Sequence, residues 1–463
     1  MRAAAKVLPA TGCPVPQKTS CSTINPYHST MKDVSMPPTN QAPLDVSAHS
    51  SLFALETPCF VFDEVELRAN FTGFQQAMRN AWGGNARLAY SVKTNPHPWI
   101  VETALACDCW AEVVSDQEYD LALACGFKPE SIVFNGPIKG KDHVRRALHE
   151  GSIVNLDSAR ELRWLAEFAA EAAQNTSCAA TLAVGLRVNI DLEHFCPGQT
   201  TSGANGGRFG YCRENGELAK AIEALRALEP QVRIAGLHMH VTTYSRSLEV
   251  YRTLARHAAS IAEEFNLNLD FVDIGGGFFG GGPRNTGAYE SYAEAIAEEL
   301  RRVFDPARTS LIVEPGGAVV CTPGSYAGRV VDAKDTGYGR FVTSELSRIN
   351  IDHEMKKTSY AYELLPHDDK SDREVLSRQV LCGYTCMESD RLCLLENEPC
   401  LEEGDLVVIA NAGAYSMSFT PGFFIERAPA TYARDAHGRY RCVDSCRTLL
   451  FDASKTPSDG SRP

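Results

Sequence analysis

Chemically useful side chains lie in this sequence at one kind of position, the end of a short apolar segment. Lys93 directly follows the first of these segments, His240 ends the sixth and Glu314 ends the eighth. The glycine run Gly275–Gly277 follows the seventh. One such residue could stand there by chance, but an amine, an imidazole, a carboxylate and a glycine run at equivalent positions indicate one shared site.

The amine and the imidazoles each have a chemical and a structural interpretation. Burial at the end of a strand would lower the pKa of Lys93 and favour the free amine that forms a Schiff base, whereas a solvated surface lysine is the plain alternative. His238 and His240 share one face of a strand, because side chains alternate. Metal binding, a hydrogen-bonded core histidine and an imidazole packed on a cofactor ring are all open for this pair.

The glycines and the acid narrow the chemistry. The backbone amides of Gly275, Gly276 and Gly277 can approach a phosphate closely. The stretch also matches a dinucleotide fingerprint, but that motif needs a helix directly after the loop, and the helical pattern begins only near Tyr289, so we predict a monophosphate. Glu314 can keep a pyridine nitrogen protonated or simply cap a loop. Together these groups predict pyridoxal 5'-phosphate, with no metal.

Eight apolar segments must position these residues, and stretches long enough for a helix separate most of them. Alternating strand and helix signals are typical of parallel βαβ units, and eight in succession predict an α/β fold with a closed (β/α)₈ barrel of the TIM type. Loops at the carboxyl ends of barrel strands build active sites. The predicted strands are Arg87–Val92, Trp110–Ser115, Ser131–Asn135, Ser152–Asp157, Leu182–Asn189, Arg233–His240, Leu269–Ile274 and Ser310–Glu314.

The remaining chain divides around this barrel. We predict a disordered tail over 1–50, an entry strand and helix over 51–84 with Asp63 as N-cap, the barrel over 85–320, a β-rich C-terminal domain over 321–450 and a flexible tail over 451–463. Residues 350–378 are polar, charged and irregular, which predicts a long loop or an insertion. The C-terminal strands are expected at Gly328–Ala333, Val380–Thr385, Leu406–Ile409 and Tyr440–Val443.

Composition excludes several classes of function. A net charge of −13 argues against general nucleic-acid binding, which depends on clustered Lys and Arg. No apolar run approaches the roughly 18 residues of a membrane span. The 16 cysteines are scattered, which favours thiols in a reducing cytoplasm over a secreted disulfide scaffold, and the first residues lack the apolar core of a secretory signal.

These motifs carry a resemblance. Tyr90-Ser91-Val92-Lys93-Thr94-Asn95, His238-Met239-His240 and Gly275-Gly276-Gly277 are similar to the motifs of the fold-type III pyridoxal-phosphate decarboxylases, the family of diaminopimelate, ornithine and carboxynorspermidine decarboxylases. The resemblance covers about 55–432 and implies an alanine racemase-like barrel, the pyridoxal phosphate cofactor and a head-to-tail homodimer with shared active sites.

The resemblance assigns roles residue by residue. It implies that Lys93 holds the cofactor, His240 stacks on its ring and Glu314 contacts the pyridine nitrogen. Further cofactor contacts are implied for Glu112, Thr243, the three glycines and Tyr415. In the C-terminal domain, Cys386 is implied as the acid that protonates Cα, and Asp390 as a residue that reaches the partner's site. Arg348 and Glu388 are further candidates for contact with substrate.

Departures from the family pattern affect the phosphate and the substrate. Gly317 stands where the family has an arginine after Glu-Pro-Gly, and Thr242-Thr243 replaces a Gly-Ser pair. Met387 intervenes between the cysteine and Glu388, and Phe423-Phe424 stands where a Tyr-Asn pair is expected. The leading hypothesis is therefore a decarboxylase of an α-amino acid with a polar distal group, most similar to diaminopimelate decarboxylase. An ornithine/lysine-type or carboxynorspermidine-type decarboxylase, a racemase and a non-catalytic binding protein are the alternatives.

Overall fold

Eight parallel strands close into a barrel. The computed structural model describes residues 52–174, 181–282, 287–352, 354–357, 359–368, 373–417, 427–444 and 447–448, so the predicted tails 1–50 and 451–463 lie outside the described residues. Each strand pairs in parallel with the next, β5 pairs with β6, and β10 pairs with β2 to complete the ring. The barrel strands are β2 (Ala86–Ser91), β3 (Trp110–Val113), β4 (Ile132–Phe134), β5 (Ile153–Leu156), β6 (Leu182–Asn189), β8 (Val232–His238), β9 (Phe271–Asp273) and β10 (Ser310–Val313).

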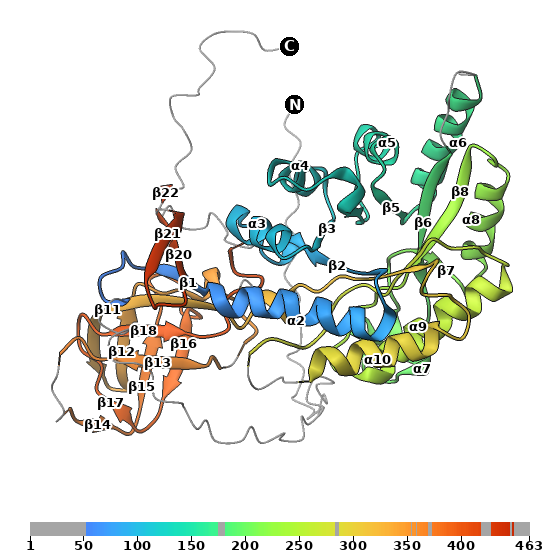
Figure 1. Ribbon diagram of the computed structural model, residues 1–463. Coiled ribbons are helices and arrows are strands. Elements are labelled where there is room, and N and C mark those ends of the chain that lie inside the picture. The colour runs from blue at the N-terminus through green and yellow to red at the C-terminus, as the bar shows by residue number, and fades with distance from the viewer. Residues whose placement is uncertain are drawn as a thin grey trace, which may run out of the picture. The chain divides into compact units, whose positions relative to one another are not determined.

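Helices follow the strands and cover the outside of the barrel (Figure 1). All eight predicted strands are confirmed to within a few residues, and the helical pattern predicted to begin near Tyr289 is confirmed as α10. The helices are α3 (Pro98–Ala106), α4 (Asp116–Ala124), α5 (Lys141–Glu150), α6 (Ala159–Gln174), α8 (Glu217–Arg226), α9 (Leu248–Glu264) and α10 (Ala288–Leu300). Among the described residues, no helix has both the length and the apolar character needed to cross a lipid bilayer.

The chain enters through β1 (Cys59–Asp63) and α2 (Glu64–Trp82). The predicted cap is confirmed, because the Asp63 side chain accepts a hydrogen bond from the Glu66 backbone N–H. This bond satisfies one of the unpaired donors of the first turn. The helix lies along α10, where Phe74 stacks on Tyr289 with ring centres 4.4 Å apart (Figure 1). The entry helix therefore completes the outer layer of the barrel next to its last helix.

The C-terminal strands form a second, mixed sheet of nine strands. Its central path runs β16–β15–β12–β11–β1–β20–β21, and β18 joins β11 to β13. The entry strand β1 is part of this sheet, antiparallel to β11 and parallel to β20. The bounds are β11 (Gly324–Thr336), β12 (Gly339–Ser344), β13 (Tyr362–Leu365), β15 (Gln379–Cys382), β16 (Arg391–Leu395), β18 (Leu406–Ile409), β20 (Ala430–Arg434) and β21 (Tyr440–Asp444).

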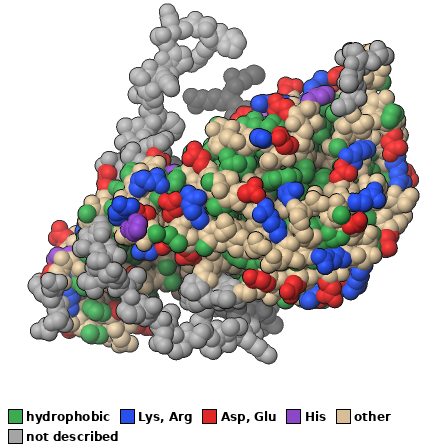
Figure 2. All heavy atoms as spheres, viewed as in Figure 1, with side chains coloured by type: hydrophobic (Ala, Val, Ile, Leu, Met, Phe, Trp, Pro, Cys, Tyr) green, Lys and Arg blue, Asp and Glu red, His purple; other side chains and the backbone are tan. Residues whose placement is uncertain are grey.

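The four strands expected in this domain are confirmed, but the long loop predicted over 350–378 is corrected. Strand β13 lies within it and pairs antiparallel with β18, with Tyr362 opposite Ile409. The strand is only four residues long, Tyr-Glu-Leu-Leu, and most of it is half-buried, so it did not stand out from the polar residues around it. On the face shown in Figure 2, basic and acidic side chains are interspersed, so the positive charge there is divided rather than gathered in one area.

Candidate active site

The first barrel strand delivers Lys93 to the site. Strand β2 ends at Ser91, and the short 3₁₀ turn Val92–Thr94 directs the lysine toward the neighbouring strand β3. Its Nζ donates to Glu112 Oε2 and to Ser91 Oγ, each at 2.7 Å. Burial lowers the pKa of Lys93, but Glu112 and Glu314 outweigh burial, and the net pKa is raised. The predicted lowering of this pKa is therefore wrong, because two carboxylates face the amine.

A continuous hydrogen-bonded network joins the lysine to Glu314 across the barrel. Asn135, which follows β4, donates through Nδ2 to Glu112 Oε1 at 3.1 Å and to Glu314 Oε1 at 2.6 Å. Glu112, Asn135 and Glu314 are each at most 4% exposed. The amine and the acid that the sequence suggested for one site are thus connected through two buried side chains, one of which, Asn135, the sequence analysis missed.

Glu314 belongs to a buried cluster with His238 and Asp273. His238 Nε2 lies 3.4 Å from Glu314 Oε2, and ligand atoms of all three side chains lie within 4.8 Å of one another. Burial raises the pKa of Glu314, but His238, Asp273 and Lys93 outweigh burial, and the net pKa is lowered. Burial and Glu314 raise the pKa of Asp273 well above its usual range. Two acids this close resist a double negative charge, and from the directions of the two pKa shifts we expect Asp273 rather than Glu314 to hold a proton.

Asp273 was not among the predicted site residues. It ends β9 and accepts through Oδ1 from the Gly275 backbone N–H at 2.8 Å. An aspartate within the apolar run Phe271–Ile274 was the signal that could have identified it. The His238–Asp273–Glu314 cluster has the residue types of a metal site. The geometry of this cluster does not test the prediction that the protein uses no metal, which therefore stays a prediction.

His240 lies beside this network as a neutral ring. Burial and the Arg187 charge lower its pKa to about 3. Its Nδ1 accepts a hydrogen bond from the Gly276 backbone N–H at 3.2 Å, so the ring proton resides on Nε2. The His238 and His240 rings are nearly parallel, with an interplanar angle of 11°. His238 contacts the buried acids, and His240 lies at the glycine loop. These contacts leave all three interpretations of the pair open.

The glycine loop is built from backbone that only glycine adopts readily. Gly275 and Gly277 have φ of 72° and 89°. A Cβ on Gly275 would lie 2.6 Å from the His240 Cβ, and one on Gly276 would lie 2.3 Å from the Glu314 backbone oxygen. The loop thus packs tightly against both residues. The N–H groups of Gly275 and Gly276 donate to Asp273 and His240, so of the three glycines Gly277 is the one whose N–H can be offered to an anion.

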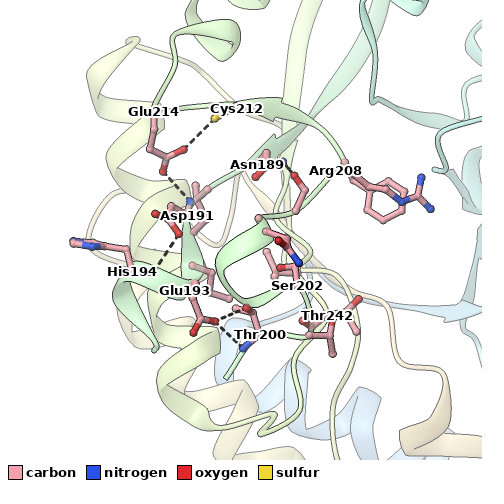
Figure 3. A pocket seen from close by; sticks show the side chains of 18 of the residues that line it. Asn189, Asp191, Glu193, His194, Thr200, Ser202, Arg208, Cys212, Glu214 and Thr242 are labelled. Atoms are coloured by element: carbon pink, nitrogen blue, oxygen red, sulfur yellow. Dashed lines mark hydrogen bonds between the residues drawn. The ribbon is translucent and has the colours of Figure 1, made fainter. Parts of the chain in front are cut away.

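A cavity of about 860 Å³ opens at the carboxyl end of β6 (Figure 3). Its volume is within the range of small-molecule sites. His240 and Arg187 line it, and Arg187 donates to Asp157 Oδ2 at 3.2 Å. Polar groups are added to the wall by Asn189, His194, Thr200, Arg208 and Thr242. His240 thus lies between the buried network and a space large enough for a substrate.

The remaining predicted residues divide between the barrel and the C-terminal domain. Thr243 is buried in the loop after His240 and accepts from the Arg246 backbone N–H at 3.3 Å. The Tyr415 backbone N–H donates to the Thr94 carbonyl at 2.8 Å, and its phenol contributes to the raised pKa of Lys93. Tyr415 therefore lies near Lys93, whereas the contacts of Thr243 are with its own loop, and Phe423-Phe424 lies outside the described residues.

The candidates from the C-terminal domain are not brought to Lys93 by the contacts within this chain. Cys386 is exposed, and Glu388 is exposed and forms an ion pair with Arg391 at 3.1 Å. Asp390 is buried and accepts hydrogen bonds from Ser347 Oγ at 2.8 Å and Thr385 Oγ1 at 2.7 Å. Its visible role is to hold the loop that carries the cysteine.

Arg348 is likewise used internally. It donates to Asp352 Oδ2 at 2.7 Å and to the Lys357 carbonyl at 2.9 Å. Substrate contacts by Arg348, Glu388 and Asp390 stay predictions.

The matching family model is the pyridoxal-dependent decarboxylase pyridoxal binding domain, which covers residues 66–321, more than half of the chain. The chain belongs to the pyridoxal-dependent decarboxylase family. It is 27% identical over 372 residues to a diaminopimelate decarboxylase from Zymomonas mobilis, covering 79% of this chain and 85% of the relative. Membership brings the cofactor with it: this is a pyridoxal phosphate-dependent amino-acid decarboxylase of the fold-type III group.

Solved structures share the fold. The diaminopimelate decarboxylase of Methanocaldococcus jannaschii matches with a TM-score of 0.74 and 23% identity over 87% of this chain and 92% of that chain, and it is also known in complex with L-lysine. The lysine/ornithine decarboxylase of Vibrio vulnificus, complexed with putrescine, matches with a TM-score of 0.65 and 23% identity over 84% of this chain and 99% of that chain. The barrel with a β-rich C-terminal domain is the architecture predicted above.

The residues of this site fit pyridoxal phosphate. The ionised Glu314 suits a protonated pyridine nitrogen, the neutral His240 ring suits a flat aromatic neighbour, and Lys93 supplies the amine. When bound, the cofactor supplies an electron sink for the electron pair that a departing carboxylate leaves behind. The individual roles of these side chains stay predictions that the network and the loop geometry support.

Proposed function

We propose that this protein decarboxylates an α-amino acid with a polar distal group, similar to diaminopimelate, and that the polar cavity beside His240 admits that group. The network from Lys93 through Glu112 and Asn135 to Glu314 is the observation that carries the proposal, because it links the amine to a carboxylate held ionised. An ionised acid at this position favours a protonated ring, which decarboxylation requires.

Each side chain has a separate proposed role in the reaction. Glu112 orients the Lys93 amine and holds its proton near the reacting centre, while Glu314 keeps a proton on the pyridine nitrogen. A bound cofactor would accept the electron pair that is left when the bond between Cα and the carboxylate breaks and carbon dioxide leaves. A proton must then reach Cα, and we propose that the Cys386 thiol of a second subunit donates it.

The cavity supports a polar distal group. His194 and Arg208 line it, and within the described residues neither side chain forms an ion pair or a hydrogen bond to another side chain. Arg208 stacks on Phe209, its guanidinium 4.0 Å from the ring centre. Both side chains offer hydrogen-bond donors to a polar group that enters the cavity.

An amino-acid panel tests the substrate. The purified enzyme would be incubated with diaminopimelate, lysine, ornithine, arginine and carboxynorspermidine while carbon dioxide and the product amine are measured. We expect release of carbon dioxide from one polar amino acid and none with Lys93→Ala. Inversion of the substrate without carbon dioxide would identify a racemase, and no turnover by a cofactor-loaded protein would favour a binding role. Either result would refute the proposal.

Mixed dimers test the shared site. Lys93→Ala and Cys386→Ser are each expected to abolish turnover. In an equal mixture of the two variants, about half of the dimers contain one subunit of each kind, and one of the two sites in such a dimer has both native residues. The mixture should therefore regain about a quarter of the wild-type activity. Absence of any recovery, when mixed dimers form, would mean that both residues act within one chain.

A further inference from the structure

A positively charged side chain stands beside the glycine loop. The Arg246 guanidinium lies 4.7 Å from the centre of the Phe279 ring, and Phe279 is two residues beyond Gly277. Among the described residues, no ion pair or side-chain hydrogen bond is formed by this guanidinium. An uncompensated cation at a loop suited to an anion is a ligand-binding arrangement that the mechanism above does not use.

The backbone contacts fix Arg246 relative to the loop. Its φ of 48° is uncommon for a residue other than glycine and is sustained only by surrounding contacts. Tyr292 Oη donates to the Arg246 carbonyl at 2.6 Å and accepts from the Phe279 backbone N–H at 3.4 Å. One tyrosine therefore ties the arginine and the glycine loop together.

The charge of Arg246 acts on the side of the loop that faces α9. Tyr251 Oη donates to the Gly276 carbonyl at 3.3 Å. Burial raises the pKa of Tyr251, and the Arg246 charge opposes that rise. The charge of Arg246 therefore acts at the hydroxyl that contacts the middle glycine of the loop.

We infer that Arg246 binds the phosphate of pyridoxal phosphate together with the Gly277 backbone N–H, since the N–H groups of Gly275 and Gly276 donate to Asp273 and His240. A guanidinium can hold two phosphate oxygens at once, and a dianion at this loop needs a cation. Gly317, which stands where the family has an arginine after Glu-Pro-Gly, has no side chain that could contact the phosphate. The inference rests on the cofactor of the family and is independent of which amino acid is decarboxylated.

Binding of two cofactor forms by the cofactor-free enzyme tests the inference. Pyridoxal phosphate and pyridoxal, which lacks the phosphate, would be titrated by absorbance against wild type and Arg246→Gln. We expect the affinity for pyridoxal phosphate to fall by about tenfold to a hundredfold, as for loss of a hydrogen bond to a charged group, with pyridoxal affinity unchanged. Arg301→Gln, at an exposed arginine that follows α10, is the matched control and should change neither affinity.

Two further variants sharpen the test. In the Arg246→Gln background, Gly317→Arg should restore affinity for pyridoxal phosphate only, because a Cβ there would lie 3.8 Å from the Ala414 Cβ, an ordinary contact. If Arg246→Gln does not fold, Arg246→Lys retains the charge and should show a smaller loss confined to pyridoxal phosphate. Equal losses for both ligands, or an unchanged affinity for pyridoxal phosphate, would overturn the inference.

Discussion

Replacing Asp273 by asparagine tests the distribution of charge beneath the cofactor site. Asp273 is fully buried, and burial together with Glu314 raises its pKa well above the usual range. The asparagine has nearly the same shape as the protonated acid. Its Oδ1 can still accept from the Gly275 N–H, and its Nδ2 can donate to Glu314 in place of the acid proton. The variant should therefore fold and retain the geometry of the glycine loop.

The expected effect on stability follows from the proton. Between the pKa of an unfolded aspartate and the raised pKa of Asp273, the folded protein holds one proton more than the unfolded chain. The free energy of unfolding of the wild type therefore falls by about 1.4 kcal/mol for each pH unit of rise in this window. The asparagine side chain has no such proton to lose. The free energy of unfolding of Asp273→Asn, relative to that of the wild type, should therefore increase by about 1.4 kcal/mol for each pH unit above about pH 4.

Urea unfolding of the cofactor-free proteins between pH 5 and 8 measures this difference. The slope is the decisive quantity, because a simple change of packing would shift the variant equally at every pH. Asp332→Asn, at an exposed aspartate of β11, is the control and should run parallel to the wild type. Parallel curves for Asp273→Asn and the wild type would show that Asp273 is ionised in the folded protein and would refute the charge assignment.

Three further predictions concern the same site. Lys93→Met should abolish the visible absorbance of the cofactor while the far-ultraviolet circular dichroism stays unchanged, and a retained visible band would argue against this lysine. The pKa of His240 is lowered to about 3, so just below about pH 6.5 the folded protein binds fewer protons than the unfolded chain. The free energy of unfolding of the wild type should therefore decrease by up to about 1.4 kcal/mol for each unit by which the pH is lowered below about 6.5. The His240→Phe variant should lack this dependence. Equal slopes for those two proteins in urea unfolding would contradict this. Gly276→Ala places a Cβ 2.3 Å from the Glu314 backbone oxygen and should cost about 1–3 kcal/mol of stability, whereas Gly317→Ala should be nearly neutral in the same assay.

The barrel was predictable because its strands are buried on both sides and therefore read as short apolar runs. The residue after each run then lies at the carboxyl end of a strand, which is why Lys93 and Glu314 could be assigned to one site from their positions in the sequence. Strand β13 was missed because it has only four residues, Tyr362–Leu365, and lies within a polar and irregular stretch of the chain, so it does not stand out as a strand buried on both sides does. The pairing of β1 with β20 joins segments from opposite ends of the chain and has no local sequence signal.

The side chains that tune the site were harder to predict than those that perform its chemistry. Asn135 ends a predicted strand, but nothing in the sequence shows that its amide lies between two carboxylates. The raised pKa of Lys93 depends in the same way on Glu112 and Glu314, which come from other strands. Sequence spacing gives the residue at the end of a strand, whereas protonation depends on neighbours that only the closed barrel brings together.

The balance of charge gives a reason for the cluster beneath the site. Glu112, Asp273 and Glu314 are three buried acids of one connected site that contains a single amine, and three negative charges there would be very costly without partners. The ion pair with Lys93 compensates Glu112, and the proton on Asp273 removes a second charge. Glu314 is left ionised beside His238. A cationic pyridine nitrogen would compensate this remaining charge, so binding of the cofactor and retention of its ring proton should reinforce each other.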